Sequence, residues 1–332
     1  MTKWLTCQRS YYYRYICGIT KTRVGDALRF GTAWHKAMEM RAKKHGFDEC
    51  YAAAITGTEI EEYTAAMMYG MLKAYFEMYD DSSFALQPEE EFALPIKGAR
   101  RFISAGKLDG IGYDVNSDLT IFEHKTTSDS VEPQSSYWER LRWNIQMLHY
   151  IWACITLIGK PARVIYDVVK KPVIKAKMIP QLDNDGLKIV VSKTTGARCY
   201  KRDGQPYQSS GTDMELAQRM ETPEEYARRV YEDIKSRPEF YFARREMSVL
   251  DDDVLSFESA RLSIVRAIMA AEKLSKRMGV EAYPRNCATW TCRTCDYSMF
   301  CMSNVIANPD CLPEGYELKR AHIELEIVQE QE

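Results

Sequence analysis

Residues 106–111 and 121–127 each have the character of a β-strand and lie at the spacing of a β-hairpin. The polar stretch that begins at Asn116 supplies the turn-forming side chains between them. If the hairpin is symmetric about Asn116, Asp109 and Glu123 lie opposite one another. Directly opposed side chains of an antiparallel pair have Cβ atoms roughly 4.5–5.5 Å apart. The sequence therefore predicts that these two carboxylates face each other.

Lys125 is expected on the same face as Glu123, because side chains alternate faces along a strand. Two close carboxylates repel, and one takes up a proton unless a cation lies between them. A hard divalent ion such as Mg²⁺ suits an oxygen pair of this kind. The alternative is an ordinary surface hairpin with a cross-strand ion pair, and the hairpin alone does not exclude it.

Composition is that of a soluble globular protein, with 332 residues, 45% hydrophobic and 28% charged. The chain is long enough for one large domain or two ordinary ones, and no linker or internal repeat divides it. We find no membrane span and no signal peptide, so we expect a cytoplasmic protein without a membrane partner.

A net charge of −2 gives no global sign of nucleic-acid binding, so a binding surface has to be local. Residues 160–177 are the best candidate, since they hold six basic residues against the single acidic Asp167. The six are Lys160, Arg163, Lys170, Lys171, Lys175 and Lys177. A solvated strand–loop face explains them equally well.

Ten cysteines are many for a reducing compartment, in which disulfides are rare. Cys292, Cys295 and Cys301 form a tight C-terminal cluster, with Cys287 before it and Cys311 after it. This spacing indicates metal ligation rather than a disulfide framework.

The remaining elements follow from hydrophobic periodicity. Helices are expected over residues 4–17, 28–40, 51–80, 136–158, 222–236 and 251–279, strands over 84–97 and 162–169, and a polar hairpin or mobile loop over 172–215. His35 lies in the second helix, where a structural role is the alternative to a ligand role. Gln146 and Tyr150 lie four residues apart in the helix at 136–158, so both could face one partner.

This order of elements and motifs resembles the PD-(D/E)xK nuclease superfamily, and most closely its RecB-like branch. The matching motifs are Gly31-x3-His35, Gly106-x2-Asp109-Gly110, Glu123-x-Lys125 and Gln146-x3-Tyr150. Cys7, followed by Arg9 and the tyrosines at 11–15, together with the C-terminal cysteine cluster, looks like the iron–sulfur subset. That subset includes the AddB nuclease domain and the CRISPR-associated RecB-like exonucleases.

The resemblance implies an α/β fold with a restriction-endonuclease-like core, in which helices flank a mixed central sheet, plus additional helices and a C-terminal iron–sulfur region. We expect one RecB-like domain over residues 1–311. Its parts would be the core at 84–170, a helical insertion at 41–80, a polar insertion at 172–215 and a helical and iron–sulfur region at 222–311, followed by an acidic tail at 312–332.

The resemblance also assigns roles to the motif residues. Asp109 and Glu123 would hold Mg²⁺ or Mn²⁺, with His35 and the backbone carbonyl of His124 completing the protein ligands. Lys125 would orient the attacking water or help to deprotonate it.

Gln146 and Tyr150 would position Lys125 and the DNA backbone. A structural [4Fe–4S] cluster would be held by Cys7, Cys292, Cys295 and Cys301, with Cys17, Cys287 and Cys311 as substitutes. Four thiolates also suit zinc, and spacing alone does not decide between the two.

The function implied is a metal-dependent DNA exonuclease that acts on single strands or duplex ends. No G-x4-G-K-[ST] loop is present, so ATP-driven unwinding would come from a separate helicase, and recombination or CRISPR proteins are possible partners. One alternative is an endonuclease of the same fold. The other is a non-catalytic DNA-binding subunit, whose signature would be loss of Asp109, Glu123 or Lys125, and all three are present.

Overall fold

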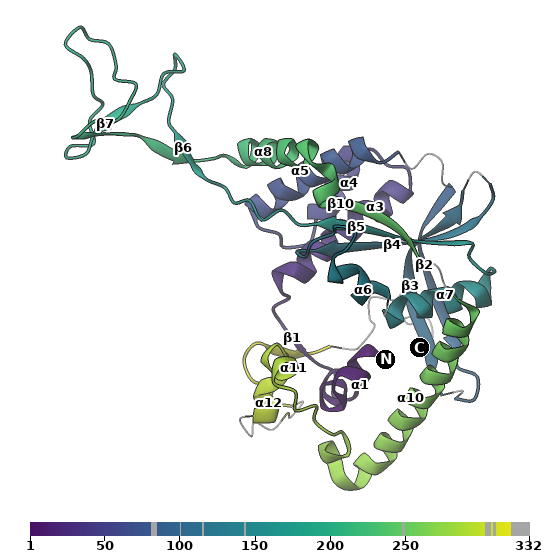
Figure 1. Ribbon diagram of the computed structural model, residues 1–332. Coiled ribbons are helices and arrows are strands. Elements are labelled where there is room, and N and C mark those ends of the chain that lie inside the picture. Colours follow the sequence, from purple (N-terminus) through teal and green to yellow (C-terminus); the bar gives the residue numbers. More distant parts are fainter. Residues whose placement is uncertain are drawn as a thin grey trace.

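The computed structural model of the chain describes residues 1–80, 85–99, 101–114, 116–142, 144–247, 250–302, 307 and 310–319. These residues form a central sheet covered by helices on both faces, an arm that projects from it, and a cysteine-rich end that contains both the N-terminal helices and the last described residues (Figure 1). The predicted acidic tail lies outside the described residues from position 320 onward.

The central sheet has the strand order β10-β5-β4-β3-β2 within the described chain. Its strands are β2 (Ala85–Pro95), β3 (Ile103–Tyr113), β4 (Leu119–Thr127), β5 (Arg163–Lys170) and β10 (Phe242–Met247). Among the described strands of this sheet, the β4–β5 pair is parallel and the other three pairs are antiparallel, which makes the sheet mixed. The β3–β4 register runs from Tyr113 opposite Leu119 to Gly110 opposite Phe122, so the hairpin is symmetric about Asn116 as predicted.

One face of the sheet packs against α3 (Asp26–Ala42), α4 (Phe47–Ile55), α5 (Glu62–Met78) and α8 (Pro223–Ser236). Buried apolar residues from all four helices form one core with Val169 and Phe242 of the sheet. The packing of α5 against α8 is close at Gly70, where an added Cβ would lie 2.6 Å from the carbonyl oxygen of Ala227. The segment expected as a helical insertion at 41–80 therefore covers much of this face.

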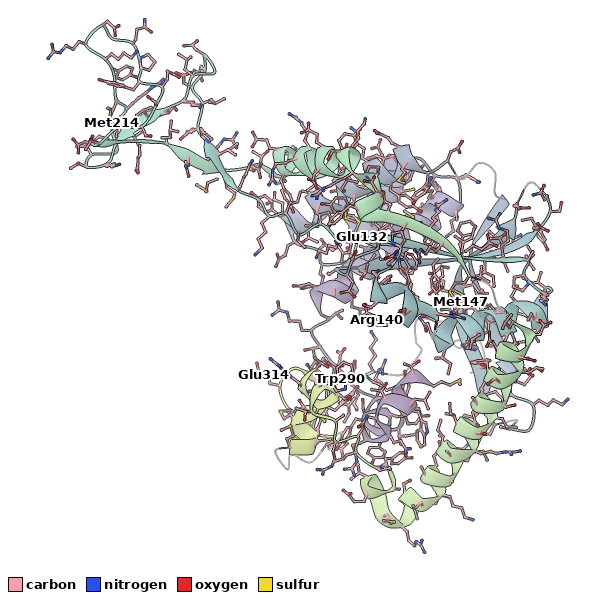
Figure 2. The ribbon with its side chains drawn as sticks, viewed as in Figure 1. Glu132, Arg140, Met147, Met214, Trp290 and Glu314 are labelled. Carbon is pink, nitrogen blue, oxygen red and sulfur yellow. The ribbon has the colours of Figure 1, made fainter. Side chains whose placement is uncertain are left out.

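The opposite face packs against α6 (Ser136–Arg142), α7 (Ile145–Leu157) and α10 (Asp251–Met278). The single helix predicted at 136–158 is wrong, because α6 ends at Arg142 and α7 begins at Ile145. The reason is a helix cap: the Asn144 side chain accepts a hydrogen bond from the backbone N–H of Gln146 at 2.9 Å. The second core, between these helices and the sheet, includes Met147, whose side chain is labelled in Figure 2.

The segment between β5 and α8 forms an arm rather than a mobile loop, built from short antiparallel pairs that extend away from the core (Figure 1). Its strands are β6 (Met178–Pro180), β7 (Val190–Ser192), β8 (Met214–Leu216) and β9 (Gln218–Met220). The basic segment at 160–177 is not one patch. Lys160 pairs with Asp251 and Arg163 with Glu246 at one end of β5, whereas Lys170 and Lys171 lie at its other end.

The N-terminus and the last described residues are joined in the cysteine-rich end. Its elements are α1 (Thr2–Thr6), α2 (Gln8–Tyr11), the π-helix Tyr12–Ile16, β1 (Ile19–Lys21), the 3-10 helix Gly279–Ala282, α11 (Thr289–Arg293), α12 (Ser298–Met302) and β11 (Tyr316–Leu318). Strand β1 pairs with β11, and Arg9 is buried against the carbonyl oxygen of Tyr283 at 2.8 Å. A short helix, α9 (Pro238–Tyr241), precedes β10. None of the helices in the described part of the chain has the length and apolar character needed to cross a membrane.

Candidate active site

The candidate site lies where β3 and β4 part. Their last paired residues are Gly110 and Phe122, and the next residue on each strand is Asp109 or Glu123. Beyond this point the carboxylate of Asp109 substitutes for the missing strand partner, because its Oδ2 accepts the backbone N–H of His124 at 3.0 Å. The predicted meeting of the two carboxylates therefore falls at a gap between two strands.

His35 reaches this gap from helix α3. Its Nδ1 lies 3.1 Å from Oδ1 of Asp109, so the two carboxylate oxygens of Asp109 contact α3 and β4 respectively. Burial opposes the charging of His35, but the hydrogen bond and charge of Asp109 outweigh it, and the pKa of His35 is raised. The same contact lowers the pKa of Asp109 despite its burial.

Glu123 is almost fully buried, with 2% of its side chain exposed. Its Oε1 pairs with the ammonium group of Lys125, while no described residue donates a hydrogen bond to its buried Oε2. Burial and the nearby Asp109 charge raise the pKa of Glu123 to about 7. A buried carboxylate oxygen without a partner is costly, and a cation in the gap would relieve that cost.

Lys125 is held on its other side by helix α7. Its Nζ donates to Oε1 of Gln146 at 3.1 Å, and Nε2 of Gln146 donates to the Tyr150 hydroxyl at 2.8 Å. Gln146 lies in the first turn of α7, where the Asn144 cap fixes the helix start. The structure thus joins Glu123, Lys125, Gln146 and Tyr150 in one hydrogen-bonded chain.

The protein groups alone do not form a finished metal centre. In the described part of the chain, no three His, Cys, Asp or Glu side chains are grouped closely enough to hold a metal ion. The types of donor nevertheless suit a hard divalent ion: the His35 imidazole contacts the Asp109 carboxylate at 3.1 Å, and the buried Oε2 of Glu123 has no described donor.

A buried polar network behind the site was missed at the sequence level. Asp167 of β5 is fully buried, and its carboxylate lies 2.7 Å from Nδ1 of His124 and 3.1 Å from Nε of Arg244. The Tyr75 hydroxyl of α5 also donates to Asp167. Burial opposes ionisation, but His124 and Arg244 hold the pKa of Asp167 well below its usual value. A signal was present, since an acidic residue inside an apolar strand needs buried partners.

The four cysteines predicted as cluster ligands lie in the cysteine-rich end and are free thiols. They are Cys7, Cys292, Cys295 and Cys301. The backbone N–H of Asn286 lies 3.5 Å from the Cys7 sulfur, and the Cys292 thiol lies 3.3 Å from the Asn286 carbonyl oxygen. Burial raises the pKa of Cys301, to which the nearby Cys295 and Cys7 also contribute. The four side chains therefore lie in the same end of the molecule. Among the described residues, however, they are not close enough together to count as a metal-binding group.

Trp290 is a second residue to which the sequence analysis assigned no role. It lies on α11, two residues before Cys292, and its side chain is 80% exposed. Figure 2 shows it on the surface of the cysteine-rich end, on the side turned toward the sheet and its helices. Tryptophan is highly buried on average, so this exposure is unusual for its type.

A mixed sheet flanked by helices, with acidic, histidine and lysine side chains at the gap between two strands, defines the restriction-endonuclease-like class of metal-dependent nucleases. A family profile of the PD-(D/E)XK nuclease superfamily matches residues 1–302, and the chain belongs to this superfamily.

A search of curated proteins gives no match. One solved structure with a similar trace is described as "Crystal structure of SSO0001", at 10% sequence identity and a TM-score of 0.29, covering 92% of this chain and 97% of that one.

Proposed function

We propose that this nuclease is a DNA exonuclease that hydrolyses phosphodiester bonds at the ends of single-stranded or duplex DNA. The observation that carries the proposal is the gap between β3 and β4, where Asp109, Glu123 and Lys125 meet and one buried Glu123 oxygen has no described partner. A non-catalytic DNA-binding subunit would have no need to keep a buried carboxylate in this unfavourable state.

Asp109, Glu123 and His35, with the backbone carbonyl of His124, are the groups that would hold Mg²⁺ or Mn²⁺. A bound divalent ion would supply an activated water and stabilise charge on the scissile phosphate. Lys125, held by Gln146 at 3.1 Å, orients the attacking water or accepts its proton. Tyr150 fixes the amide of Gln146 and so the direction in which Lys125 points.

The preference for a single strand is supported by Trp290 in the cysteine-rich end. Exposed aromatic side chains stack on unpaired bases, which a duplex keeps inside the helix. Arg293, on the same short helix, is exposed and could contact a phosphate. A strand that lies on Trp290 and ends at the Asp109–Glu123 gap would be degraded from its end.

We further propose that Cys7, Cys292, Cys295 and Cys301 bind a structural [4Fe–4S] cluster. The support is that Cys7 and Cys292 both contact Asn286 and that Cys295 and Cys301 pack against one buried aromatic cluster. Such a cluster would strengthen the junction that β1 and β11 already make. On this view residues 1–311 form one domain, and any unwinding comes from a separate helicase or recombination partner.

The test compares end-labelled linear single-stranded DNA with circular single-stranded DNA, each with Mg²⁺ or Mn²⁺ and protein purified without oxygen. Degradation of only the linear substrate is the expected result. Cutting of the circle as well would instead identify an endonuclease of the same site. Failure to cut either of these, duplex DNA or RNA would leave a binding subunit and refute catalysis.

A further inference from the structure

His124 lies in the part of strand β4 beyond its described ladder with β3. Beyond the Gly110–Phe122 pair, β4 has lost its ladder with β3, and the described ladder on its other side is the parallel one with β5. In that ladder His124 lies beside Asp167, and the antiparallel ladder of β10 places Arg244 beside Asp167 as well. Three neighbouring strands thus align His124, Asp167 and Arg244 in one row across the sheet.

The side chains of this row are joined. Asp167 accepts from Arg244 at 3.1 Å through one oxygen, and the other lies 2.7 Å from Nδ1 of His124. Tyr75 donates to that second oxygen, and its hydroxyl accepts from Arg244 at 2.8 Å. Asp167 is fully buried, so the imidazole of His124 is held by a carboxylate that is itself fixed from two other sides.

The backbone of the same residue faces the metal-binding groups. The N–H of His124 donates to Asp109 at 3.0 Å, and Glu123 and Lys125 are its chain neighbours. Any movement of this residue therefore changes the spacing of Asp109 and Glu123 across the gap. Outer groups that orient metal-binding residues typically affect metal affinity by about 10–100-fold.

We propose that Asp167 is a positioning residue: by holding the His124 ring, it fixes the part of β4 that sets the separation of the Asp109 and Glu123 carboxylates. The inference rests on the proposed metal site and adds a residue that touches neither metal nor DNA. Its effect is on the affinity for the divalent ion, and the chemistry at saturating ion is left nearly intact.

The experiment measures Mn²⁺ binding to DNA-free protein from the electron paramagnetic resonance signal of free Mn²⁺, with urea unfolding of the metal-free protein alongside. H124L and D167N are expected to weaken Mn²⁺ binding about tenfold. H124N, whose amide can again donate to Asp167, is expected to restore binding to within about twofold of wild type.

Y75F is the matched control, because it removes a donor to the same buried carboxylate without touching His124. It is expected to lower stability while reducing Mn²⁺ affinity much less than H124L does, because Arg244 still holds Asp167 at 3.1 Å and the His124 contact remains. Wild-type affinity in H124L, or equal losses of affinity in H124L and Y75F, would overturn the proposal. Absence of Mn²⁺ binding in the wild type would refute the metal site itself. Failure of the metal site is thereby distinguished from failure of the positioning role of Asp167. If D167N does not fold, the two His124 variants decide.

Discussion

At the scale of single residues, the site combines favourable contacts with one costly feature. Asp109 satisfies both of its oxygens through His35 and His124, but Glu123 satisfies only Oε1 within the described chain. A protein selected for stability alone would gain by replacing such a group. The cost is understandable if the buried oxygen is reserved for a cation.

A partly buried histidine in α7, His149, predicts a pH dependence of stability that is separate from the site. His149 lies 2.7 Å from the Ser104 hydroxyl, and burial, with the charge of Arg261, lowers the pKa of His149 to about 4. The unfolded chain binds this proton near pH 6.5, so the contribution of His149 to stability is constant above that pH and is lost as the pH falls from 6.5 to 4. The loss from this group is about 2.5 kcal/mol by pH 4.5.

Urea unfolding of wild type and H149F at pH 7.5 and pH 4.5 checks this. The free energy of unfolding of the wild type should fall by about 2.5 kcal/mol more than that of H149F over this interval. Subtracting the fall seen in H149F from that of the wild type cancels the contribution of the acidic groups, which titrate in both proteins. An identical fall in the two proteins would contradict the assignment of His149 as neutral in the folded state.

At the scale of elements, the hairpin was predictable and its surroundings were not. Its register was predicted by assuming a hairpin symmetric about Asn116, and that assumption held because strand pairing across a short turn is local. The break between α6 and α7 escaped periodicity, since Leu141 and Ile145 lie four residues apart and continue the apolar stripe across it. Asn144 was the available signal, as a capping residue inside an apparent helix.

Strand β10 and the Asp167 network were not predicted, because both depend on pairing between residues far apart in the sequence. Strand β10 has the sequence Phe-Ala-Arg-Arg-Glu-Met, which is too polar to indicate a strand in the sheet. Its place beside β5 depends on Arg244 and Asp167, which are 77 residues apart. The active-site motifs were accessible from sequence because they occur in chain order, whereas the Asp167 network appears only when three strands are side by side.

The contact between α5 and α8 predicts that adding a methyl group at Gly70 destabilises the protein. G70A improves helix propensity, yet its Cβ would meet the backbone oxygen of Ala227 at 2.6 Å, which cannot rotate away. We expect a net loss of about 1–3 kcal/mol in the free energy of unfolding, measured by urea denaturation.

G25A is the control, because the same change at the start of α3 meets nothing within 4 Å. Gly25 caps α3, and Ala is a poorer cap but restricts the unfolded chain, so the two effects oppose and the net change should stay below about 1 kcal/mol. Equal effects of the two substitutions would mean that α5 and α8 are not packed as described.

At the scale of the whole molecule, the cysteine-rich end brings together residues near both ends of the described chain, and the sheet places chemistry in its middle. The contact of Arg9 with Tyr283, the β1–β11 pair and the shared contacts of Asn286 hold these distant segments together. Loss of this end would therefore disturb the whole nuclease as well as the cysteines.

The cluster proposal predicts the metal content of protein purified without oxygen. Wild type should carry roughly four iron atoms and matching sulfide per chain, and C7S or C292S should lose most of both. C199S, which changes a cysteine in the arm, should keep wild-type iron. One zinc and no iron would instead establish a four-thiolate zinc site.

The surface of the cysteine-rich end predicts where a single strand binds. W290A should weaken binding of a fluorescent single-stranded oligonucleotide by about 1–3 kcal/mol, measured by anisotropy in EDTA so that no cleavage occurs. Y200A removes an exposed aromatic side chain (55%) from the projecting arm and should have little effect. The reverse result would move strand binding to the arm.

The central claim is that the β3–β4 gap is the catalytic site, and the most direct measurement separates metal binding from cleavage in K125A. Mn²⁺ affinity and cleavage of linear single-stranded DNA would be measured on K125A and wild type, with K160A, at the far end of β5, as control. We predict that K125A still binds Mn²⁺ but loses cleavage by at least about 100-fold, while K160A keeps both. Cleavage by K125A at the wild-type rate would contradict the account and place the chemistry elsewhere.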